Sequence, residues 1–434
     1  DALSIEKISE DEWEIGIHIA DVSHYVKEGT VLNDEAYERA TSVYLVDRVV
    51  PMLPEKLSNK VCSLRPHEEK LCFSAVFKMN RKAEILEEWF GRTVIYSDHR
   101  FTYEDAQDVI EKKQGKFVDE ILLMDQLAKK MRSKRIKEGA ITFDRVEVKF
   151  RLDQANNPNS VYFKKAKDAN KLIEEFMLLA NRQVASFIGK KMDGTPSKKP
   201  FVYRVHDVPD PDKIGAFSKF VKQFGYQMIM KNTKDIANSM NRVLADVSGK
   251  REENIVELLA IRTMSKAKYT TENIGHYGLG FHYYTHFTSP IRRWPDVMVH
   301  RLLQQYLDGE KVKNKEAIET QCKHSSEMEK LSTDAERSSI KYMQVKYLMG
   351  KEGQEFNALV SGVTEFGMFV ELEDSLCEGL VSMRDIKDDH YVLNKESHSL
   401  IGRKTGNKFQ LGDPLRVRVR NVDLVKKQLD FELV

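Results

Sequence analysis

The residue pattern of this 434-residue chain changes character near residues 351–353. Before this point, residues 315–348 carry one long helical pattern. After it, short alternating runs of apolar and polar residues are separated by glycines, which is typical of a small β-barrel. Because a chain of this length exceeds what one hydrophobic core supports, we expect more than one domain. The predicted domains are residues 1–348 and residues 352–434.

The first domain is predicted to be α+β, with a β-sheet core and surrounding helices. Apolar side chains occupy every second position from Trp13 to Ile19, which predicts a strand with one buried face. Alternation of this kind predicts strands at residues 13–22, 71–79 and 84–96. Helical periodicity dominates after Tyr103. It predicts helices at residues 168–190, 212–225, 297–307 and 315–348.

Composition narrows the class of protein. The 69 basic and 67 acidic residues give a net charge of only +2, so any nucleic-acid binding must rest on local clusters of charge. No apolar run approaches ~20 residues, so we expect no membrane span. The four cysteines show no C-x-x-C spacing. This predicts free thiols in a reducing compartment, the cytoplasm, rather than disulfides or a zinc site.

Residues 282–296 (HYYTHFTSPIRRWPD) concentrate imidazoles, hydroxyls and two arginines around a Ser-Pro turn before a helix. Arginine offers a planar fork of donors that matches phosphate oxygens, and Thr288 and Ser289 add hydroxyl donors. This combination is suited to holding a phosphodiester. The alternative is a solvated loop that caps the following helix.

The full string resembles the signature of the ribonuclease II/ribonuclease R (RNB) family of exoribonucleases. Further motifs of that family occur in order, and they comprise residues 1–4 (DALS), 18–26 (HIADVSHYV) and 334–337 (DAER). The Trp-Pro-Asp sequence at 294–296 favours the bacterial ribonuclease R branch. The resemblance implies a Mg²⁺-dependent, processive, hydrolytic 3′→5′ exoribonuclease that degrades single-stranded RNA to nucleoside 5′-monophosphates.

The resemblance also implies catalytic residues. Asp1 matches the last of four metal-binding aspartates, and the other three are not in this chain, which we interpret as a fragment of a longer protein with further OB-type domains upstream. Arg292 matches the catalytic arginine, and its alternative role is to cap a helix. Glu336 matches a glutamate near the metals, and its alternative is to face water. His18 and Asp21 are expected to brace the metal-binding loop through hydrogen bonds.

RNA contacts follow from the same resemblance. Tyr44 and Phe143 match aromatic residues that stack on the terminal nucleotides, although either could instead be a core residue. Tyr103 and Glu175 match positions that read the ribose 2′-hydroxyl. The adjacent Glu174 is the alternative to Glu175, because only one of two neighbours on a helix can face a channel. Arg293 is a weaker candidate for contact with phosphate. The basic run 129–137 fits either the RNA path or a solvated helix face.

The C-terminal module resembles the RNA-binding OB barrel found in a ribosomal protein. Phe366 and Phe369 are the predicted stacking platforms. Arg416, Arg418 and Arg420 alternate with aliphatic residues, which predicts a basic stripe on one strand face. The family's usual histidine after Gly-Leu-Val is Ser382 here.

Two hypotheses about function follow. In the first, the protein is a monomeric exoribonuclease that acts on single-stranded RNA. In the second, it is a non-catalytic RNA-binding protein that retains the channel but has lost the metal site. The sequence directly upstream of Asp1 would discriminate between them, because three further aspartates there favour the enzyme.

Overall fold

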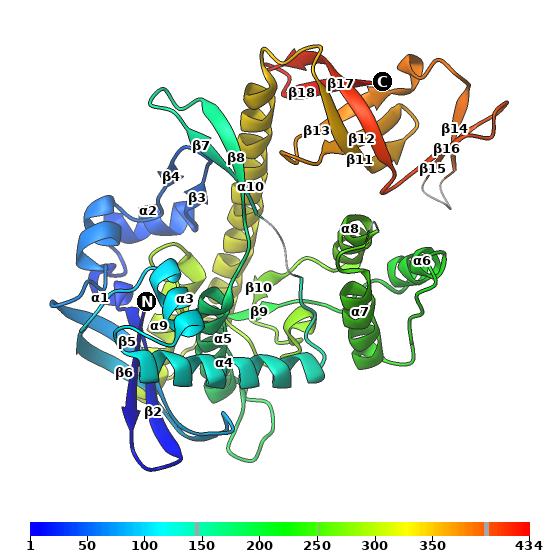
Figure 1. Cartoon of the computed structure of the whole chain (residues 1–434). Coiled ribbons are helices and arrows are strands. Elements are labelled where there is room, and N and C mark those ends of the chain that lie inside the picture. The colour runs from blue at the N-terminus through cyan, green and yellow to red at the C-terminus, as the bar shows by residue number, and fades with distance from the viewer. Residues whose placement is uncertain (144–146, 251, 395–398) are drawn as a thin grey trace.

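An antiparallel four-stranded sheet forms the centre of the N-terminal part. The computed structural model describes residues 1–143, 147–250, 252–394 and 399–434 (Figure 1). The sheet order is β1-β2-β5-β6, with β1 at Ala2–Lys7, β2 at Glu12–Ala20, β5 at Glu69–Asn80 and β6 at Ile85–Tyr96. All three predicted strands are therefore confirmed. On the core face Ile15 of β2 lies opposite Phe77 of β5, and Ile17 opposite Ala75.

The predicted first strand is two residues too long. β2 ends at Ala20, because the buried Asp21 carboxylate accepts hydrogen bonds from Ser23 Oγ and the His24 N–H and so caps helix α1 (Val22–Tyr25). The expectation of one buried face was also wrong for the end of β2. His18 and Ala20 on the opposite face are buried as well.

Helices pack against the sheet and share its hydrophobic core. Their positions agree with the predicted α+β class. They are α2 (Val31–Arg39), α3 (Tyr103–Lys112), α4 (Val118–Lys137), α5 (Asp168–Gly189) and α9 (Trp294–Leu307). Small two-stranded sheets connect them, namely β3 (Val43–Tyr44) with β4 (Val49–Val50), β7 (Glu147–Leu152) with β8 (Pro158–Lys164), and β9 (Tyr203–Val205) with β10 (Lys268–Thr270). Single helical turns lie at Lys56–Val61 and Tyr277–Leu279.

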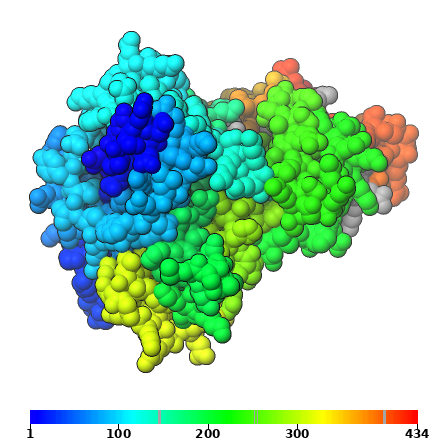
Figure 2. All heavy atoms as spheres, turned by 90° about the horizontal axis from the view of Figure 1, so that it is seen from below, coloured from blue at the N-terminus to red at the C-terminus, as the bar shows by residue number. Residues whose placement is uncertain are grey.

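Three further helices form a lobe beside the sheet (Figure 2). They are α6 (Pro211–Lys222), α7 (Thr233–Val247) and α8 (Glu253–Thr263). Their buried side chains cluster with those of the C-terminal barrel, not with those of the sheet. The helix predicted at 212–225 ends at Lys222, before Gly225, whose φ of 88° is left-handed. The predicted division of the chain into domains at residues 1–348 and 352–434 stays a prediction.

A single 34-residue helix, α10 (Lys315–Leu348), links the sheet domain to the barrel (Figure 1). Its bounds coincide with the predicted helix, and Asn314 caps its first turn by accepting from the Ala317 N–H. Near its end, Gln344 Nε2 donates to the Leu376 carbonyl 2.8 Å away, and Lys341 contacts the Glu378 carbonyl. α10 therefore holds one side of the barrel.

The C-terminal barrel is closed by five strands in the order β11-β12-β13-β18-β17, which confirms the predicted OB-type fold. Gly367 has a φ of 148°, and a Cβ there would lie 2.2 Å from the Val381 carbonyl oxygen, so only glycine fits. The strands are β11 (Glu355–Thr364), β12 (Gly367–Leu372), β13 (Glu378–Ser382), β17 (Pro414–Asp423) and β18 (Gln428–Leu433). A separate sheet contains β14 (Tyr391–Asn394), β15 (Ser399–Gly402) and β16 (Lys408–Gln410), and a helical turn lies at Met383–Asp385.

Candidate active site

Three segments that are distant in sequence meet around Arg292. The Ser42 N–H donates to the Arg292 carbonyl over 3.0 Å, and the Trp294 N–H donates to the Ala40 carbonyl over 2.8 Å. Two residues further along the same segment, the Tyr44 N–H donates to Glu336 Oε1 on α10 over 3.1 Å. The structure thus brings together the predicted catalytic arginine, the predicted catalytic glutamate and the predicted stacking tyrosine.

The two neighbouring arginines differ in their surroundings. The Arg292 side chain is exposed, and its Nη2 lies 3.2 Å from Ser289 Oγ, to which it donates. Arg293 is half-buried and makes two hydrogen bonds of 2.8 Å to the fully buried Asp296 carboxylate. Asp296 also accepts the Ser289 N–H at 2.7 Å. Arg293 therefore fixes the loop, while Arg292 remains free to meet a substrate.

Glu336 is half-buried and holds the β3 segment in place. Besides the Tyr44 N–H, its Oε1 accepts a hydrogen bond from Ser332 Oγ at 3.2 Å. One turn along α10, Ser339 Oγ accepts the Val46 N–H at 3.1 Å. The alternative in which Glu336 only faces water was therefore wrong. The carboxylate determines where the Tyr44 backbone lies.

Hydrogen bonds brace the end of the sheet that Asp1 precedes, while the bracing of a metal-binding loop stays a prediction. His18 Nδ1 and Nε2 lie 2.7 and 2.9 Å from the hydroxyls of Ser74 and Ser4. Burial lowers the pKa of His18 to about 4, so its imidazole is neutral at pH 7. The buried Asp21 pairs with Arg92 on β6 at 3.0 Å.

Asp1 is exposed and lies directly before β1. Within the described ranges of the chain, no group of three or more His, Cys, Asp or Glu side chains could hold a metal ion. Mg²⁺ prefers several oxygen ligands, and Asp1 supplies a single carboxylate. The described residues alone therefore do not fit the predicted magnesium site.

The loop before Arg292 contains a histidine that the sequence did not single out. His286 Nδ1 lies 2.7 Å from the Tyr269 hydroxyl, and Arg204 stacks on the Tyr269 ring. Burial first, and then the guanidinium groups of Arg293 and Arg204, lower the pKa of His286 well below its ordinary value. A neutral imidazole beside arginines can donate or accept one further hydrogen bond. The imidazoles within residues 282–296 were the only signal for it.

Of the two predicted hydroxyl donors, Thr288 is buried and only Ser289 is partly exposed. The predicted stacking residues also differ. Tyr44 is 47% exposed, so it is not a core residue. Phe143 is half-buried against the second hydrophobic cluster. The preceding Thr142 N–H donates to an asparagine on α7.

The two residues predicted to read the 2′-hydroxyl lie in different surroundings. Tyr103 begins α3 and is 45% exposed. Glu175 is only 4% exposed and pairs with the buried Arg135 of α4, while the neighbouring Glu174 is exposed. Glu175 and Arg135 line a small hollow of about 40 Å³ together with Arg182. Access to Glu175 is through this hollow.

The predicted basic run on α4 is partly neutralised. Lys129 Nζ lies 2.7 Å from an Asp125 carboxylate oxygen and 2.9 Å from one of Asp168. Arg135 of the same run is the buried partner of Glu175. The run therefore does not present a continuous row of free cations.

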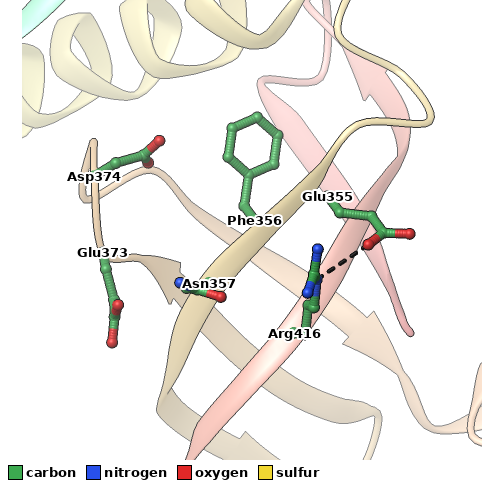
Figure 3. Close-up of a pocket in the computed structure, with 6 residues that line it drawn as sticks. All are labelled: Glu355, Phe356, Asn357, Glu373, Asp374 and Arg416. Atoms are coloured by element: carbon green, nitrogen blue, oxygen red, sulfur yellow. Dashed lines mark ion pairs between the residues drawn. The ribbon is translucent and has the colours of Figure 1, made fainter.

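The aromatic residues of the barrel are exposed as expected, but its arginines are paired. Phe366 is largely exposed in the β11–β12 turn, and Phe369 lies on the outer face of β12. Arg416 pairs with Glu355 at 3.0 Å (Figure 3). Arg418 pairs with both Glu355 and Glu432, at 2.9 and 3.1 Å.

Acidic side chains therefore offset the predicted basic stripe. Arg420 contacts Asp385, so each of the three arginines has a carboxylate partner. Beside Arg416, a hollow on the barrel surface contains more carboxylates than cations (Figure 3). It is lined by Glu355, Phe356, Asn357, Glu373, Asp374 and Arg416. This face is poorly suited to phosphate groups.

Two sequence profiles of known domains match the chain. The RNB domain matches residues 1–309, and the S1 RNA-binding domain matches residues 350–433. The chain belongs to the RNB family. The RNB segment contains Asp1, Tyr44 and Arg292, and the matching profile confirms the resemblance drawn from their motifs. Glu336 lies on α10 between the two matched segments.

Curated RNB relatives are named ribonuclease R. The chain is 38% identical to ribonuclease R of Aquifex aeolicus and 37% identical to that of Thermotoga maritima. Each alignment includes 100% of this chain and 62% of the relative. The alignment with the Escherichia coli enzyme, at 31% identity, includes 55% of that protein. The chain thus spans less than two thirds of the length of these relatives.

Solved structures show the same RNB fold. RNase R of Mycoplasma genitalium, in complex with ribose-methylated single-stranded RNA, superposes with a TM-score of 0.91 at 27% identity over 100% of this chain and 68% of that chain. Yeast Ssd1, described as a pseudonuclease, superposes with a TM-score of 0.73 at 18% identity over 92% of this chain and 49% of that chain. The second likeness concerns the fold alone.

Among the described residues, no helix has the length and apolar character needed to cross a membrane. The four cysteines are buried free thiols, as predicted.

Proposed function

We propose that this protein is a 3′→5′ exoribonuclease that processively hydrolyses single-stranded RNA and releases nucleoside 5′-monophosphates. The observation that carries the proposal is the joining of Tyr44, Arg292 and Glu336 by backbone and carboxylate hydrogen bonds. The chain in which they meet is 38% identical to a ribonuclease R. An exposed ring, an exposed guanidinium and a fixed carboxylate are the groups that a phosphodiester hydrolase for single strands requires.

Each of the three residues has a proposed role. The exposed Arg292 guanidinium, oriented by Ser289 Oγ, stabilises the negative charge that develops on the phosphorus oxygens in the transition state. Tyr44 stacks on a base near the 3′ end of the RNA. Glu336 fixes the Tyr44 backbone and so places that base relative to Arg292. Orienting the attacking water is its second proposed role.

The remaining predicted RNA contacts stay proposals with unequal support. The exposed rings of Tyr103, Phe366 and Phe369 are accessible to bases. Arg293 is engaged by Asp296, and Glu175 by Arg135, so both are better placed to position other groups than to contact RNA. The other proposed contacts are Phe143, Thr288, Ser289, Arg416 and Arg418.

We also propose that hydrolysis requires Mg²⁺, with Asp1 as one ligand. A divalent ion in such a site supplies positive charge and a nucleophile at neutral pH. Because the described residues do not complete the site, the roles of Arg292, Tyr44 and Glu336 are assigned independently of the ion. The proposed setting is the cytoplasm, and the proposed state is a monomer.

The deciding experiment uses 5′-labelled single-stranded RNA and the full-length protein, with Mg²⁺ or with EDTA. A short labelled limit product without intermediate bands, formed only with Mg²⁺, is the expected result. A ladder of intermediates would contradict processivity. Labelled mononucleotide as the first product would contradict the direction of degradation.

A non-catalytic RNA-binding function is the second candidate. It requires only exposed aromatic rings such as those of Tyr44 and Phe366, which can stack on bases without a metal ion. In the same experiment, RNA that stays intact with Mg²⁺ but shifts on a native gel would establish this function. RNA with a hairpin and a 3′ overhang would then show whether an active protein degrades duplexes.

A further inference from the structure

The β7–β8 hairpin is a two-stranded ribbon with one face against α10. Phe150 of β7 lies opposite Val161 of β8. The Phe150 ring packs edge-on against Tyr347 of α10, with 6.5 Å between ring centroids. At the turn, Lys346 Nζ donates to the Asn156 carbonyl. These contacts hold the ribbon along the last turns of α10 (Figure 1).

On the opposite face of the ribbon, basic side chains surround the exposed ring of Tyr162. Tyr162 lies directly across from Lys149, and side chains two positions along each strand share its face. The Arg151 guanidinium lies 5.5 Å from the centroid of the Tyr162 ring. Lys164 follows on the same strand, opposite Glu147. The Tyr162 side chain is 41% exposed, so the ring is accessible beside its cations.

The outer face of the ribbon carries more cations than carboxylates. It contains Lys149, Arg151 and Lys164 against Glu147, a net charge of +2. Glu147 pairs with Lys149 at 3.1 Å. Among the described residues, no carboxylate forms an ion pair with Arg151 or Lys164. The charge on this face therefore remains available, unlike that of the barrel arginines.

The ribbon and the Tyr44 segment lie against the same helix. Glu336 holds Tyr44, and Tyr347, eleven residues later, contacts the ribbon. Eleven residues correspond to about 16 Å along a helix. A strand bound at Tyr44 thus has the ribbon within reach along α10.

We propose that the outer face of the β7–β8 ribbon is a second binding site for single-stranded RNA. In this site Tyr162 stacks on a base, and Arg151 and Lys164 contact phosphates. The site binds nucleotides on the 5′ side of those at Tyr44. This inference rests on the proposed function, because it assumes that the 3′ end of the RNA reaches Arg292.

The test measures RNA affinity as a function of RNA length, in EDTA so that no hydrolysis occurs. Single-stranded RNAs from about 4 to about 20 nucleotides bracket one and two binding sites. The variants are Tyr162→Ala and the double variant Arg151→Gln/Lys164→Gln. Tyr162→Phe keeps the ring and should behave as wild type. Two matched controls remove exposed side chains far along the chain from the ribbon. They are Tyr96→Ala at the end of β6 and Arg81→Gln in the β5–β6 turn.

We expect wild-type affinity to rise between the short and the long RNAs. Tyr162→Ala should weaken binding of long RNA by roughly 5- to 100-fold and leave short RNA unchanged, since stacking on one base is lost. The double variant should also flatten the salt dependence, by about 1.4 in the slope of log K against log salt for two lost phosphate contacts.

Three outcomes would contradict the proposed ribbon site or the proposed function. If the variants bind long RNA as tightly as wild type does, the ribbon is not an RNA site. If they lose short RNA equally, the defect lies at Tyr44, and the inference also fails. If wild-type protein binds neither RNA, the proposed function itself is wrong.

Discussion

Arg292 and Arg293 are neighbours in sequence, but their replacement should have different effects. Replacing Arg292 should lower the rate of hydrolysis, and replacing Arg293 should lower the stability of the fold. Arg292→Ala removes an exposed guanidinium, so we expect kcat to fall by roughly 10²- to 10³-fold with little change in RNA affinity. Its thermal stability should match that of wild type. Single-turnover rates and equilibrium binding measure the two effects separately. An equal loss in rate and in affinity would show that Arg292 only binds RNA.

Arg293→Ala leaves the buried Asp296 carboxylate without its partner. Removing one member of a buried ion pair lowers the free energy of unfolding by about 3–5 kcal/mol. The midpoint of urea unfolding should therefore move to a clearly lower urea concentration. Unchanged stability would contradict the structural role assigned to Arg293.

Glu336 offers a comparison between a positioning and a chemical role. Glu336→Gln keeps an oxygen that can accept the Tyr44 N–H, whereas Glu336→Ala loses it. If the carboxylate mainly positions Tyr44, the glutamine variant should retain the affinity for the RNA 3′ end, and the alanine variant should lose about tenfold. If glutamine abolishes turnover at normal affinity, the negative charge itself takes part in the reaction.

Sequence motifs located Arg292, Tyr44 and Glu336, but they could not show what each side chain contacts. Asp296, which pairs with Arg293, is only three residues away in sequence. This pair could therefore have been predicted from the local sequence. The partners of Arg416 and Arg418, by contrast, come from β11 and β18. A pattern of alternating residues within one strand cannot predict ion pairs with strands that are distant in sequence. For this reason a stripe predicted to be basic was found to be neutralised.

At the scale of elements, the ion pair between Arg135 of α4 and Glu175 of α5 joins two helices. Arg135→Met should destabilise the protein by about 3–5 kcal/mol, because the buried Glu175 carboxyl group is left without its partner. Replacing both residues by leucine should restore most of that loss. The exposed pair of Lys112 with Asp108 on α3 is the control, and its removal should cost less than about 1 kcal/mol. Equal losses would contradict the burial of the first pair.

The elements with strong periodicity were predicted well, and the short ones were not. α10 matched its predicted bounds because an asparagine cap and an unbroken helical pattern define it locally. β3 and β4 have two residues each, and tertiary hydrogen bonds to α10 hold them. No local pattern encodes such strands. The burial of α6–α8 with the barrel is likewise a property of packing between distant segments.

At the scale of the whole molecule, the stability of the fold should depend on pH through a carboxyl group of the barrel. Burial, and then the Glu378 carboxylate, raise the pKa of Glu371 on β12 from 4.5 to about 7. A carboxyl group with a raised pKa binds more protons in the folded state, so its stabilising contribution is lost as the pH rises from about 4.5 to about 7.

Glu371→Gln should therefore be more stable than wild type at pH 8, by about 1–3 kcal/mol, with the difference vanishing near pH 4. Urea unfolding at several pH values measures this. Glu373→Gln, which removes an exposed carboxylate of the same barrel, should show no such trend. A constant difference at all pH values would mean that Glu371 is not protonated in the folded protein.

Three parts of the molecule contact α10 at successive positions along its axis. They are the Tyr44 segment at Glu336, the barrel at Gln344 and the β7–β8 ribbon at Tyr347. Each residue of a helix adds 1.5 Å and about 100° of rotation. A single residue inserted between Glu336 and Gln344 would rotate the barrel contact by about 100° relative to the Tyr44 segment. Substitutions on the exposed face of α10 should therefore be tolerated better than insertions or deletions within it.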